Sequence, residues 1–298
     1  MNTAQRLGYS DKDKLLIINA DDFGMCHATN AGVQQLLVEE FISSTTVMMP
    51  CAWSKEAAVW SAAHPAYNVG VHLTFTSEWK NFKWGPVTRN ANTDSLLTDE
   101  GYFPPDCLTF EQQADIGQVK AEIIQQIESA KRLGVDPTHL DNHMGSLYGL
   151  RTGRDFLEIV IDICAEYGLP LRMPRHVPGQ AISSEIAQIA AQRAELADRK
   201  GVVIIDYLVD WPYAPATAGT YEEAKIRLTD ALRGIQPGLS ELIMHPSFVT
   251  DELKAITPHY EWRGTEFALL RDPDLRKIVA DEHIHVIRWS DLRQLQRQ

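Results

Sequence analysis

The sequence predicts an α/β fold, specifically a deformed (β/α) barrel of the TIM type with about seven or eight strands. Short apolar, β-branched segments alternate with helical segments along the chain, which is the pattern of a parallel sheet. Asp, His or Arg residues follow several of these strands directly. The 298 residues suffice for one such barrel, and no linker or repeat divides them, so we expect a single catalytic domain over residues 1–298.

The first half of the chain begins with the apolar run Leu-Leu-Ile-Ile-Asn-Ala, which ends in the adjacent carboxylates Asp21 and Asp22. An apolar run of this length is typical of a strand that is buried on both faces. Asp and Gly are also ordinary turn residues, so this stretch alone equally permits a solvated turn. Neighbours on a strand point to opposite sides, so we expect a bend at Phe23 and Gly24 if both carboxylates enter one site. The elements predicted here are strand 15–20, helix 30–40, strand 44–49, helix 54–63 and strand 68–74.

Residues 75–105 interrupt this alternation with a long loop that is rich in aromatic residues. A loop of this length inside a compact domain is usually functional or disordered, and its aromatic residues argue against disorder. Two interpretations are equally favoured: a loop packed by its own rings, or a wall whose rings stack on a ligand. Under the second interpretation, we expect Trp79 or Trp84 to line the substrate cleft.

The second half of the chain continues the alternation. Helix 109–133 is predicted to begin with a capping box formed by Thr109 and Gln112 and to stop at Gly134. Ser290 is expected to cap the terminal helix. The elements between them are a strand end at 137–145, helix 155–167, strand 171–175, helix 185–200, strand 202–206, helix 221–235, strand 241–246, a helix over 267–280 broken at Pro273, and strand 285–289.

Composition excludes several classes of partner. The formal net charge of −12 argues against a nucleic acid or an anionic membrane as the main partner. We find neither a signal peptide nor a membrane-spanning run. The four cysteines form no CxxC pair, so neither a zinc knuckle nor a disulfide framework is indicated, and we expect a cytoplasmic protein.

Polar residues at the strand ends carry the functional prediction. The residues at or near the carboxyl ends of different predicted strands are Asp21, Asp22, His72, His143, Arg172 and His245. In a parallel barrel these ends converge on one face, where polar residues are typically catalytic. Each histidine alone could be a structural residue. Several polar residues at the ends of different strands are much less easily explained as a coincidence. His139 shares a strand face with Asp141 and His143. We expect it at most to support the metal-binding residues without binding the metal itself.

The other histidines show no such placement, and we expect them to be surface or structural residues: His27, His64, His176, His259, His283 and His285. One carboxylate and two histidines suit a catalytic divalent metal, because they leave coordination positions for water and substrate.

Four motifs resemble the YdjC-like carbohydrate deacetylases, which include chito-oligosaccharide deacetylases and are similar to polysaccharide deacetylases of the NodB type. The motifs are Asn-Ala-Asp-Asp-Phe-Gly at 19–24, Gly-Val-His-Leu-Thr at 70–74, Thr-His-Leu-Asp-Asn-His at 138–143 and Met-His-Pro at 244–246. The resemblance implies a deformed barrel and metal-dependent removal of N-acetyl groups from amino sugars or chito-oligosaccharides. The expected partner is therefore a small carbohydrate, and a homodimer is compatible with the sequence.

The resemblance also implies roles. Asp22, His72 and His143 would hold one divalent ion, Mg or Zn. Asp21 would be the general base and His245 the general acid. Arg172 would orient the base, with Arg175 as the alternative.

The chain departs from the resemblance at Gly145, where family members often carry a second histidine. Tyr148 and the aromatic loop also look particular to this chain, and these differences concern the substrate more than the chemistry. Two alternatives stay open: another metal-dependent barrel enzyme, such as an isomerase or phosphoesterase, or a catalytically silent sugar-binding protein on the same fold.

Overall fold

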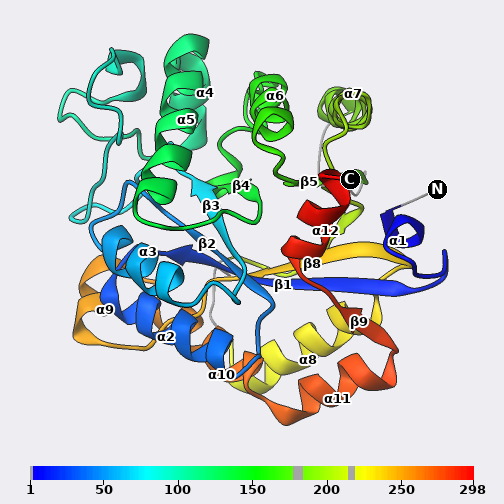
Figure 1. Cartoon of the computed structure of the whole chain (residues 1–298). Helices are drawn as coiled ribbons and strands as arrows, with labels where there is room; N and C mark the ends of the chain where they lie inside the picture. Colours follow the sequence, from blue (N-terminus) through cyan, green and yellow to red (C-terminus); the bar gives the residue numbers. More distant parts are fainter. Residues whose placement is uncertain (1–2, 177–183, 214–218) are drawn as a thin grey trace.

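The computed structural model describes residues 3–176, 184–213 and 219–298 of the chain. Its strands form one parallel sheet in the order β6-β5-β4-β3-β2-β1-β8-β7, with β9 paired to β1 (Figure 1). This arrangement is a nearly closed barrel and confirms the predicted deformed TIM-like fold. The strands are β1 Lys14–Phe23, β2 Ser44–Val47, β3 Val69–Leu73, β4 Leu140–Asn142, β5 Leu171–Pro174, β6 Ile204–Ile205, β7 Tyr207–Leu208, β8 Gly238–Met244 and β9 Ile284–Val286.

The sheet closes through one short stretch of chain. Strands β6 and β7 are separated only by Asp206, and they pair with β5 on one side and β8 on the other. The Asp206 carboxylate accepts a hydrogen bond of 2.8 Å from the backbone N–H of Leu239 on β8, which holds the two edges together. Because the edges meet here, the carboxyl ends of strands β1 to β8 surround one opening.

Helices cover both sides of the strands (Figure 1). In that view α2, α3 and α8 to α11 lie on one side, and α4 to α7 lie on the other. The helices are α1 Thr3–Arg6, α2 His27–Val38, α3 Ser54–Ala63, α4 Cys107–Gln113, α5 Ile116–Arg132, α6 Leu157–Tyr167, α7 Ser184–Lys200, α8 Tyr221–Arg233, α9 Asp251–Ile256, α10 Tyr260–Leu270, α11 Pro273–Asp281 and α12 Trp289–Gln296, with short helical turns η1 Asp94–Leu96 and η2 His143–Gly145. Among the described residues, no helix is both long and apolar enough to cross a lipid bilayer.

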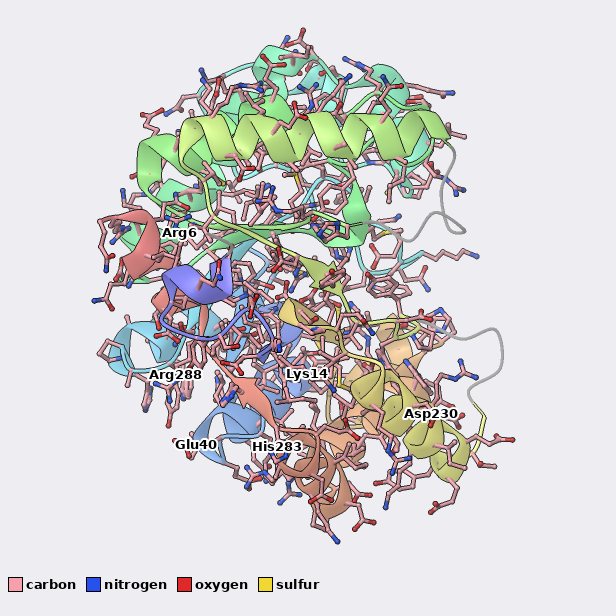
Figure 2. The ribbon with its side chains drawn as sticks, turned by 90° about the vertical axis from the view of Figure 1, so that its right-hand side faces the viewer. Arg6, Lys14, Glu40, Asp230, His283 and Arg288 are labelled. Carbon is pink, nitrogen blue, oxygen red and sulfur yellow. The ribbon has the colours of Figure 1, made fainter. Side chains whose placement is uncertain are left out.

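The amino-terminal end of the barrel is closed by an apolar cluster. Residues from β1, β6 and β8 pack there against helices α1 and α12: Ala4, Leu15, Ile17, Val203, Ile205, Leu239, Ile287, Trp289, Leu292 and Leu295. Strand β9 reinforces this end by pairing Ile284 with Lys14 at the start of β1, and Figure 2 labels Lys14 and His283, the residue before β9, on this side of the molecule. The barrel is therefore sealed at this end, and it opens only where the strands end in polar residues.

Several predicted boundaries were wrong. Helix 109–133 is two helices, because Ala114 is extended and Asp115 caps α5. The predicted capping box is absent: Asp106 caps α4 by accepting a hydrogen bond from the backbone N–H of Thr109. The last helix begins at Trp289, so Ser290 lies inside its first turn instead of capping it.

The sequence interpretation also missed α9, β7 and the first part of α10. Helix α10 begins at Tyr260, well before the predicted start at residue 267. Its buried face carries Arg263 and Glu266, and these charged residues break the apolar period that predicts a helix.

The aromatic loop 75–105 is largely packed by its own rings. Phe75 lies 5.8 Å from Phe103 and 5.1 Å from Phe110, measured between ring centroids, and all three are fully buried. Trp84 is also buried, and its Nε1–H donates a hydrogen bond of 2.7 Å to the Thr76 carbonyl. This packing fixes the start of the loop directly after β3, next to the candidate site.

Candidate active site

A β-bulge lets two adjacent carboxylates reach the same cavity. Neighbours on a regular strand point to opposite faces. Between Ala20 and Phe23 of β1, however, the register against β2 shifts by one residue, and Asp22 takes a left-handed φ of 66°. The bend was expected one residue later, at Phe23 and Gly24. A non-glycine residue in this conformation is uncommon and strained, and such residues cluster at functional sites.

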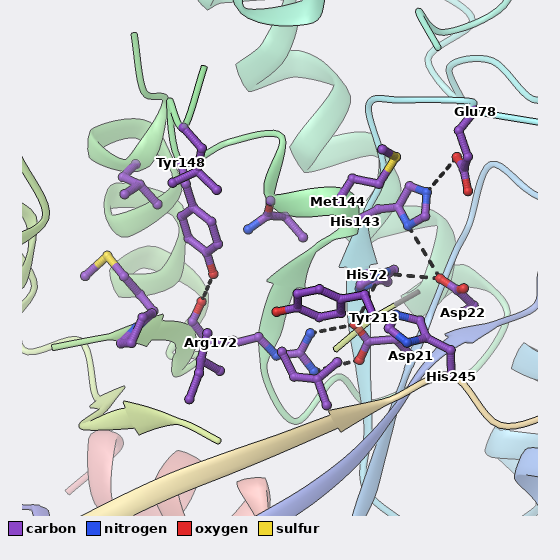
Figure 3. Close-up of a pocket in the computed structure, with 18 of the residues that line it drawn as sticks. Asp21, Asp22, His72, Glu78, His143, Met144, Tyr148, Arg172, Tyr213 and His245 are labelled. Atoms are coloured by element: carbon purple, nitrogen blue, oxygen red, sulfur yellow. Dashed lines mark hydrogen bonds and ion pairs between the residues drawn. The ribbon is translucent and has the colours of Figure 1, made fainter. Parts of the chain in front are cut away.

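Asp22 lies at the centre of three potential metal ligands. Its Oδ1 atom is 3.4 Å from His143 Nδ1 and 3.6 Å from His72 Nε2 (Figure 3). These three side chains form a group whose ligand atoms all lie within 4.8 Å of one another. All three are at least nine-tenths buried, and among the described residues Asp22 Oδ1 has no hydrogen-bond partner.

The geometry and donor types of this triad fit a divalent metal. Donors about 2.1 Å from one ion are separated by roughly 3.0–3.4 Å in tetrahedral or octahedral geometry, close to the distances here. A second group, formed by Asp21, His72 and Asp141, also lies within 4.8 Å. Its carboxylates are already paired with Arg172, at 2.7 Å each, whereas Asp22 Oδ1 is unpaired. The triad around Asp22 is therefore the better site.

Each histidine of the triad is oriented by a carboxylate on its other ring nitrogen. His72 Nδ1 donates to Asp141 at 2.7 Å, and His143 Nε2 donates to Glu78 at 3.0 Å (Figure 3 shows the second pair). Such carboxylate–histidine pairs fix ring orientation in metal sites. Burial lowers the pKa of His143, but Glu78 and Asp22 outweigh this effect and raise it to about 10. The negative charge that favours a proton there also favours a cation.

Asp21 forms an ion pair with a buried arginine. Arg172 Nη1 and Nη2 donate hydrogen bonds of 2.8 and 2.7 Å to the two carboxylate oxygens of Asp21. The same guanidinium binds Glu241 at 3.0 Å and Asp141 at 2.7 Å. Burial alone would raise the pKa of Asp21, but Arg172 and His72 hold it well below its usual range, so Asp21 is ionised at neutral pH.

The alternative arginine lies elsewhere. Arg175 is partly exposed and pairs with Asp198 on α7 at 2.8 Å, so it does not contact either aspartate. Arg172 is the arginine that contacts Asp21.

A second arginine, which the sequence analysis did not select, holds Asp22. Arg263 on α10 donates a hydrogen bond of 2.6 Å to Asp22 Oδ2 and leaves Oδ1 facing the histidines. Burial would raise the pKa of Asp22, but Arg263 and His143 keep it well below its usual range. Asp22 is therefore ionised, as a metal ligand must be.

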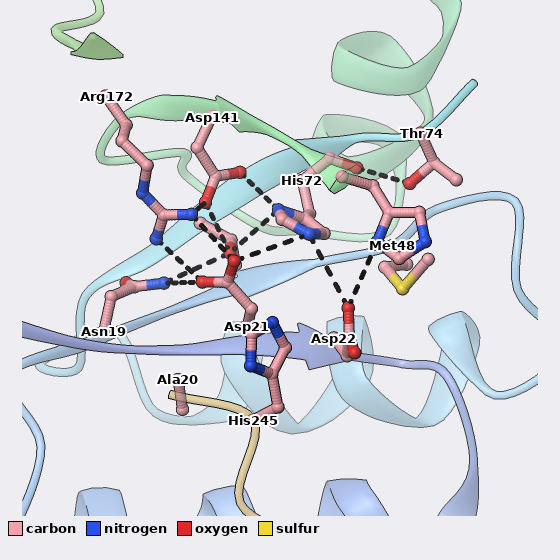
Figure 4. Close-up of polar contacts among 12 residues, drawn as sticks. Asn19, Ala20, Asp21, Asp22, Met48, His72, Thr74, Asp141, Arg172 and His245 are labelled. Atoms are coloured by element: carbon pink, nitrogen blue, oxygen red, sulfur yellow. Dashed lines mark hydrogen bonds and ion pairs between the residues drawn. The ribbon is translucent and has the colours of Figure 1, made fainter. Parts of the chain in front are cut away.

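His245 follows β8 and lies beside Asp21 in Figure 4. Its backbone N–H donates to Glu266 at 2.7 Å, while its Nδ1 has no partner among the described residues. Burial lowers the pKa of His245 to about 4, against the opposing effect of Asp22 and Asp21. The imidazole is therefore neutral at pH 7 in the free protein.

One cavity of about 670 Å³ connects these groups. It is lined by all six residues predicted from the strand ends, and also by Glu78, Trp79 and Arg263. Trp79 therefore lines the cavity, and the buried Trp84 does not. His259, expected to be structural, lines the cavity as well and lies 6.1 Å from the Trp79 ring.

His139 lies below the cavity and does not line it. Its ring stacks on Trp289 at 4.3 Å, in the closed end of the barrel. Above that layer, Trp289 Nε1 donates to Glu241, which binds Arg172 and through it Asp21. A series of contacts between buried side chains thus connects the apolar end of the barrel with the cavity.

Comparison with known proteins finds relatives along nearly the whole chain. A carbohydrate deacetylase of Thermus thermophilus is 28% identical over 294 residues, covering 99% of this chain and 99% of that protein. A chitooligosaccharide deacetylase of Yersinia enterocolitica is 26% identical over 294 residues, covering 94% of this chain and 99% of that protein. A crystal structure from Enterococcus faecalis, of a proposed cellobiose-phosphate cleavage protein, superposes with a TM-score of 0.75 at 24% identity and covers 94% of this chain and 99% of that one.

The likeness to the solved structure concerns the fold. The family assignment rests on a separate match: the model of the YdjC-like protein family matches residues 15–281, which include every strand-end residue of the site. The chain therefore belongs to the YdjC-like family.

Proposed function

We propose that this protein is a metal-dependent carbohydrate deacetylase that hydrolyses the N-acetyl group of amino sugars or chito-oligosaccharides. The observation that carries the proposal is the buried Asp22 Oδ1 atom, which accepts no hydrogen bond from the described residues and lies 3.4 and 3.6 Å from two histidines that are themselves oriented by carboxylates. The names of the related deacetylases support the same activity.

Asp22, His72 and His143 would hold the ion, and their two imidazoles favour Zn²⁺ over Mg²⁺. A divalent ion at this position supplies Lewis acidity, which polarises an amide carbonyl and makes a water molecule more acidic.

Asp21 is suited to accept the proton of the attacking water. Its Oδ2 atom lies 3.6 Å from His72 Nε2, so it borders the proposed ligand triad without belonging to it. Arg172 keeps this carboxylate ionised and fixes its orientation with two hydrogen bonds. The same arginine makes Asp21 a weak base, so the water that it deprotonates must already be acidified.

His245 is placed to protonate the leaving amine. An amine leaves poorly unless it gains a proton, and a histidine suits that task. Because its pKa of about 4 leaves His245 neutral at pH 7, the ring must gain its proton within the enzyme–substrate complex. Asp21, which takes a proton from water and lies beside His245, is the nearest source in this proposal (Figure 4).

The test is acetate release. The protein, loaded in turn with Zn²⁺ and Mg²⁺, is incubated with N-acetylglucosamine and with chito-oligosaccharides of increasing length. We expect acetate from at least one of them and no release after the metal is removed by a chelator. A metal-saturated, folded protein that releases no acetate from any of these sugars would contradict the proposal.

The alternative functions find less support. Phosphate chemistry favours free cationic groups, but both arginines that line the cavity are paired with buried carboxylates. A silent sugar-binding protein would not need a base or an acid, yet Asp21 and His245 both line the cavity beside the triad.

A further inference from the structure

The two ends of the cavity differ in chemistry. Near Asp22, three polar atoms of lining residues are buried and have no partner in the described part of the chain: Trp79 Nε1, Arg263 Nη1 and His245 Nδ1. Beyond Arg172, the lining becomes apolar. We call this second end the apolar chamber, and its principal residues are Leu150, Leu157, Met173, Ile189, Ala190 and Leu208.

Two polar side chains that border the apolar chamber, Tyr148 and Arg172, already make their hydrogen bonds within the protein. The Tyr148 hydroxyl donates to the backbone carbonyl of Arg172, as Figure 3 shows. The Arg172 guanidinium is occupied by Asp21, Asp141 and Glu241. A sugar ring placed in the chamber would therefore lose hydrogen bonds to water and find few replacements, which is costly.

An N-acyl amino sugar has two substituents that leave the reacting carbonyl in opposite directions. One is the sugar, which needs hydrogen-bond partners, and the other is the acyl chain, which needs none. With the carbonyl carbon between Asp21 and the triad, the end near Asp22 offers donors to the sugar. The opposite end, as far as the described residues line it, offers mainly apolar side chains.

We propose that the apolar chamber receives the acyl chain of the substrate, and that this enzyme prefers N-acyl amino sugars whose acyl group is longer than acetyl. This inference rests on the proposed function and keeps its chemistry. Water adds to the carbonyl carbon, the C–N bond breaks, the amine takes a proton, and a carboxylate leaves with the acyl chain. The cavity volume of about 670 Å³ is that of a site for a whole drug-sized ligand.

The chain-length dependence of hydrolysis tests the proposal. Burial of each further methylene in an apolar site is worth up to about fourfold in affinity. We therefore expect kcat/KM to rise from N-acetyl- through N-butanoyl- to N-hexanoylglucosamine, by roughly tenfold or more in total. Values that stay level or fall along this series would overturn the inference, as would a preference for longer chito-oligosaccharides at constant acyl length.

A binding measurement separates this inference from the proposed function. Hexanoate and acetate are titrated into the metal-loaded protein by calorimetry, and we expect hexanoate to bind at least tenfold more tightly. Equal affinities would overturn the chamber assignment even if acetate is released from N-acetylglucosamine. Conversely, tighter hexanoate binding without hydrolysis of any N-acylglucosamine would support the chamber and refute the deacylase.

Paired variants on α7 place the effect in the chamber. Ala190 lines the cavity, whereas its neighbour Ala191 is exposed to solvent. We expect Ala190→Phe to lower kcat/KM for N-hexanoylglucosamine at least tenfold more than for N-acetylglucosamine, which removes the hexanoyl preference. The control Ala191→Phe should change neither.

A second variant covers the case in which Ala190→Phe fails to fold. Leu150 is 44% exposed and lines the cavity, so Leu150→Asp puts a charge beside the chamber with little risk to folding. It should weaken hexanoate binding at least fivefold and acetate binding much less. An equal loss for both carboxylates would contradict the proposed chamber.

Discussion

Asp21 and Asp22 are neighbours in the chain, but the two sides of the site around them are built from different kinds of structure. The Asp21 side consists of residues on strands: Arg172 on β5, Asp141 on β4 and Glu241 on β8. The Asp22 side consists of Glu78 from the loop after β3 and Arg263 from α10, together with His143 at the end of β4.

This difference separates two tasks. On the Asp21 side, one guanidinium meets three carboxylates, all of them nearly or fully buried, so its geometry is rigid. On the Asp22 side, one carboxylate oxygen is held by Arg263 and the other faces the histidines without a partner. The first arrangement suits the proposed base, and the second leaves a negative oxygen that could bind a cation. Variants on the two sides of the site should therefore differ in their effects on metal binding and on turnover.

The largest effect is expected from exchanging the two aspartates for asparagine. Asp21→Asn should retain metal and lose roughly two to four orders of magnitude in kcat, the usual contribution of a general base. Its amide nitrogen displaces one Arg172 contact, but Arg172 Nη1 keeps its ion pair with Asp141. Asp22→Asn should lose metal affinity first and recover part of its activity in excess metal. The measurement is metal titration of both variants, followed by turnover at saturation.

Melting temperatures close to that of the parent protein are the control for both variants. Rescue of Asp21→Asn by metal, without rescue of Asp22→Asn, would mean that the two roles are reversed.

The next effect concerns His245, which lies beside both aspartates. His245→Asn should slow the hydrolysis of an N-acetyl sugar much more than that of an activated acetyl ester, because only the amine needs a proton to leave. A difference of roughly tenfold or more between the two substrates is expected. Parallel assays on both substrates, at saturating metal, provide the measurement. An equal loss on amide and ester would assign His245 to another task, such as binding the oxyanion.

The same division explains what the sequence could predict. The six strand-end residues were found because strands of a parallel barrel end at one face, and all six line the cavity. Arg172 could be named on resemblance, but its choice over Arg175 needed the observed contact with Asp21. A bend was expected near Asp22 because neighbouring carboxylates cannot point to the same face of a regular strand. The observed bulge lies one residue before the expected position.

Residues contributed by the loop and by helix α10 were missed. Arg263 reaches Asp22 across 241 positions of sequence, and Glu78 reaches His143 across 65. Charged residues on a helix or in a loop usually face solvent, so nothing in their local pattern distinguishes these two. Asp141 was also missed, but the sequence could have indicated it. It lies two positions before His143, and residues two apart on a strand point to the same face.

An intermediate effect is expected from the two carboxylates that orient the histidines. Asp141→Asn and Glu78→Gln should each weaken metal binding by roughly 10- to 100-fold, because such partners raise the basicity of the ligand and fix its ring. Only Asp141→Asn should also lower the melting temperature of the metal-free protein, because Asp141 binds Thr46 and Arg172 as well.

Metal titration and thermal melting of the metal-free proteins measure the two effects separately. Equal destabilisation by both variants would remove the distinction between a rigid strand side and a loop side.

The smallest effect on activity is expected in the aromatic loop, where Trp79 and Trp84 lie five positions apart but in different surroundings. Trp79 lines the cavity, and an aromatic face contributes a modest amount to binding, so Trp79→Ala should raise KM by roughly twofold to tenfold with metal content unchanged.

Trp84 is 3% exposed and does not line the cavity. Trp84→Ala should instead destabilise the fold, by about 3–5 kcal/mol for a buried tryptophan. Steady-state kinetics and denaturant unfolding of both variants test this contrast. Unchanged kinetics for Trp79→Ala would exclude this ring from substrate binding and leave Glu78, which orients His143, as the contribution of the loop to the site.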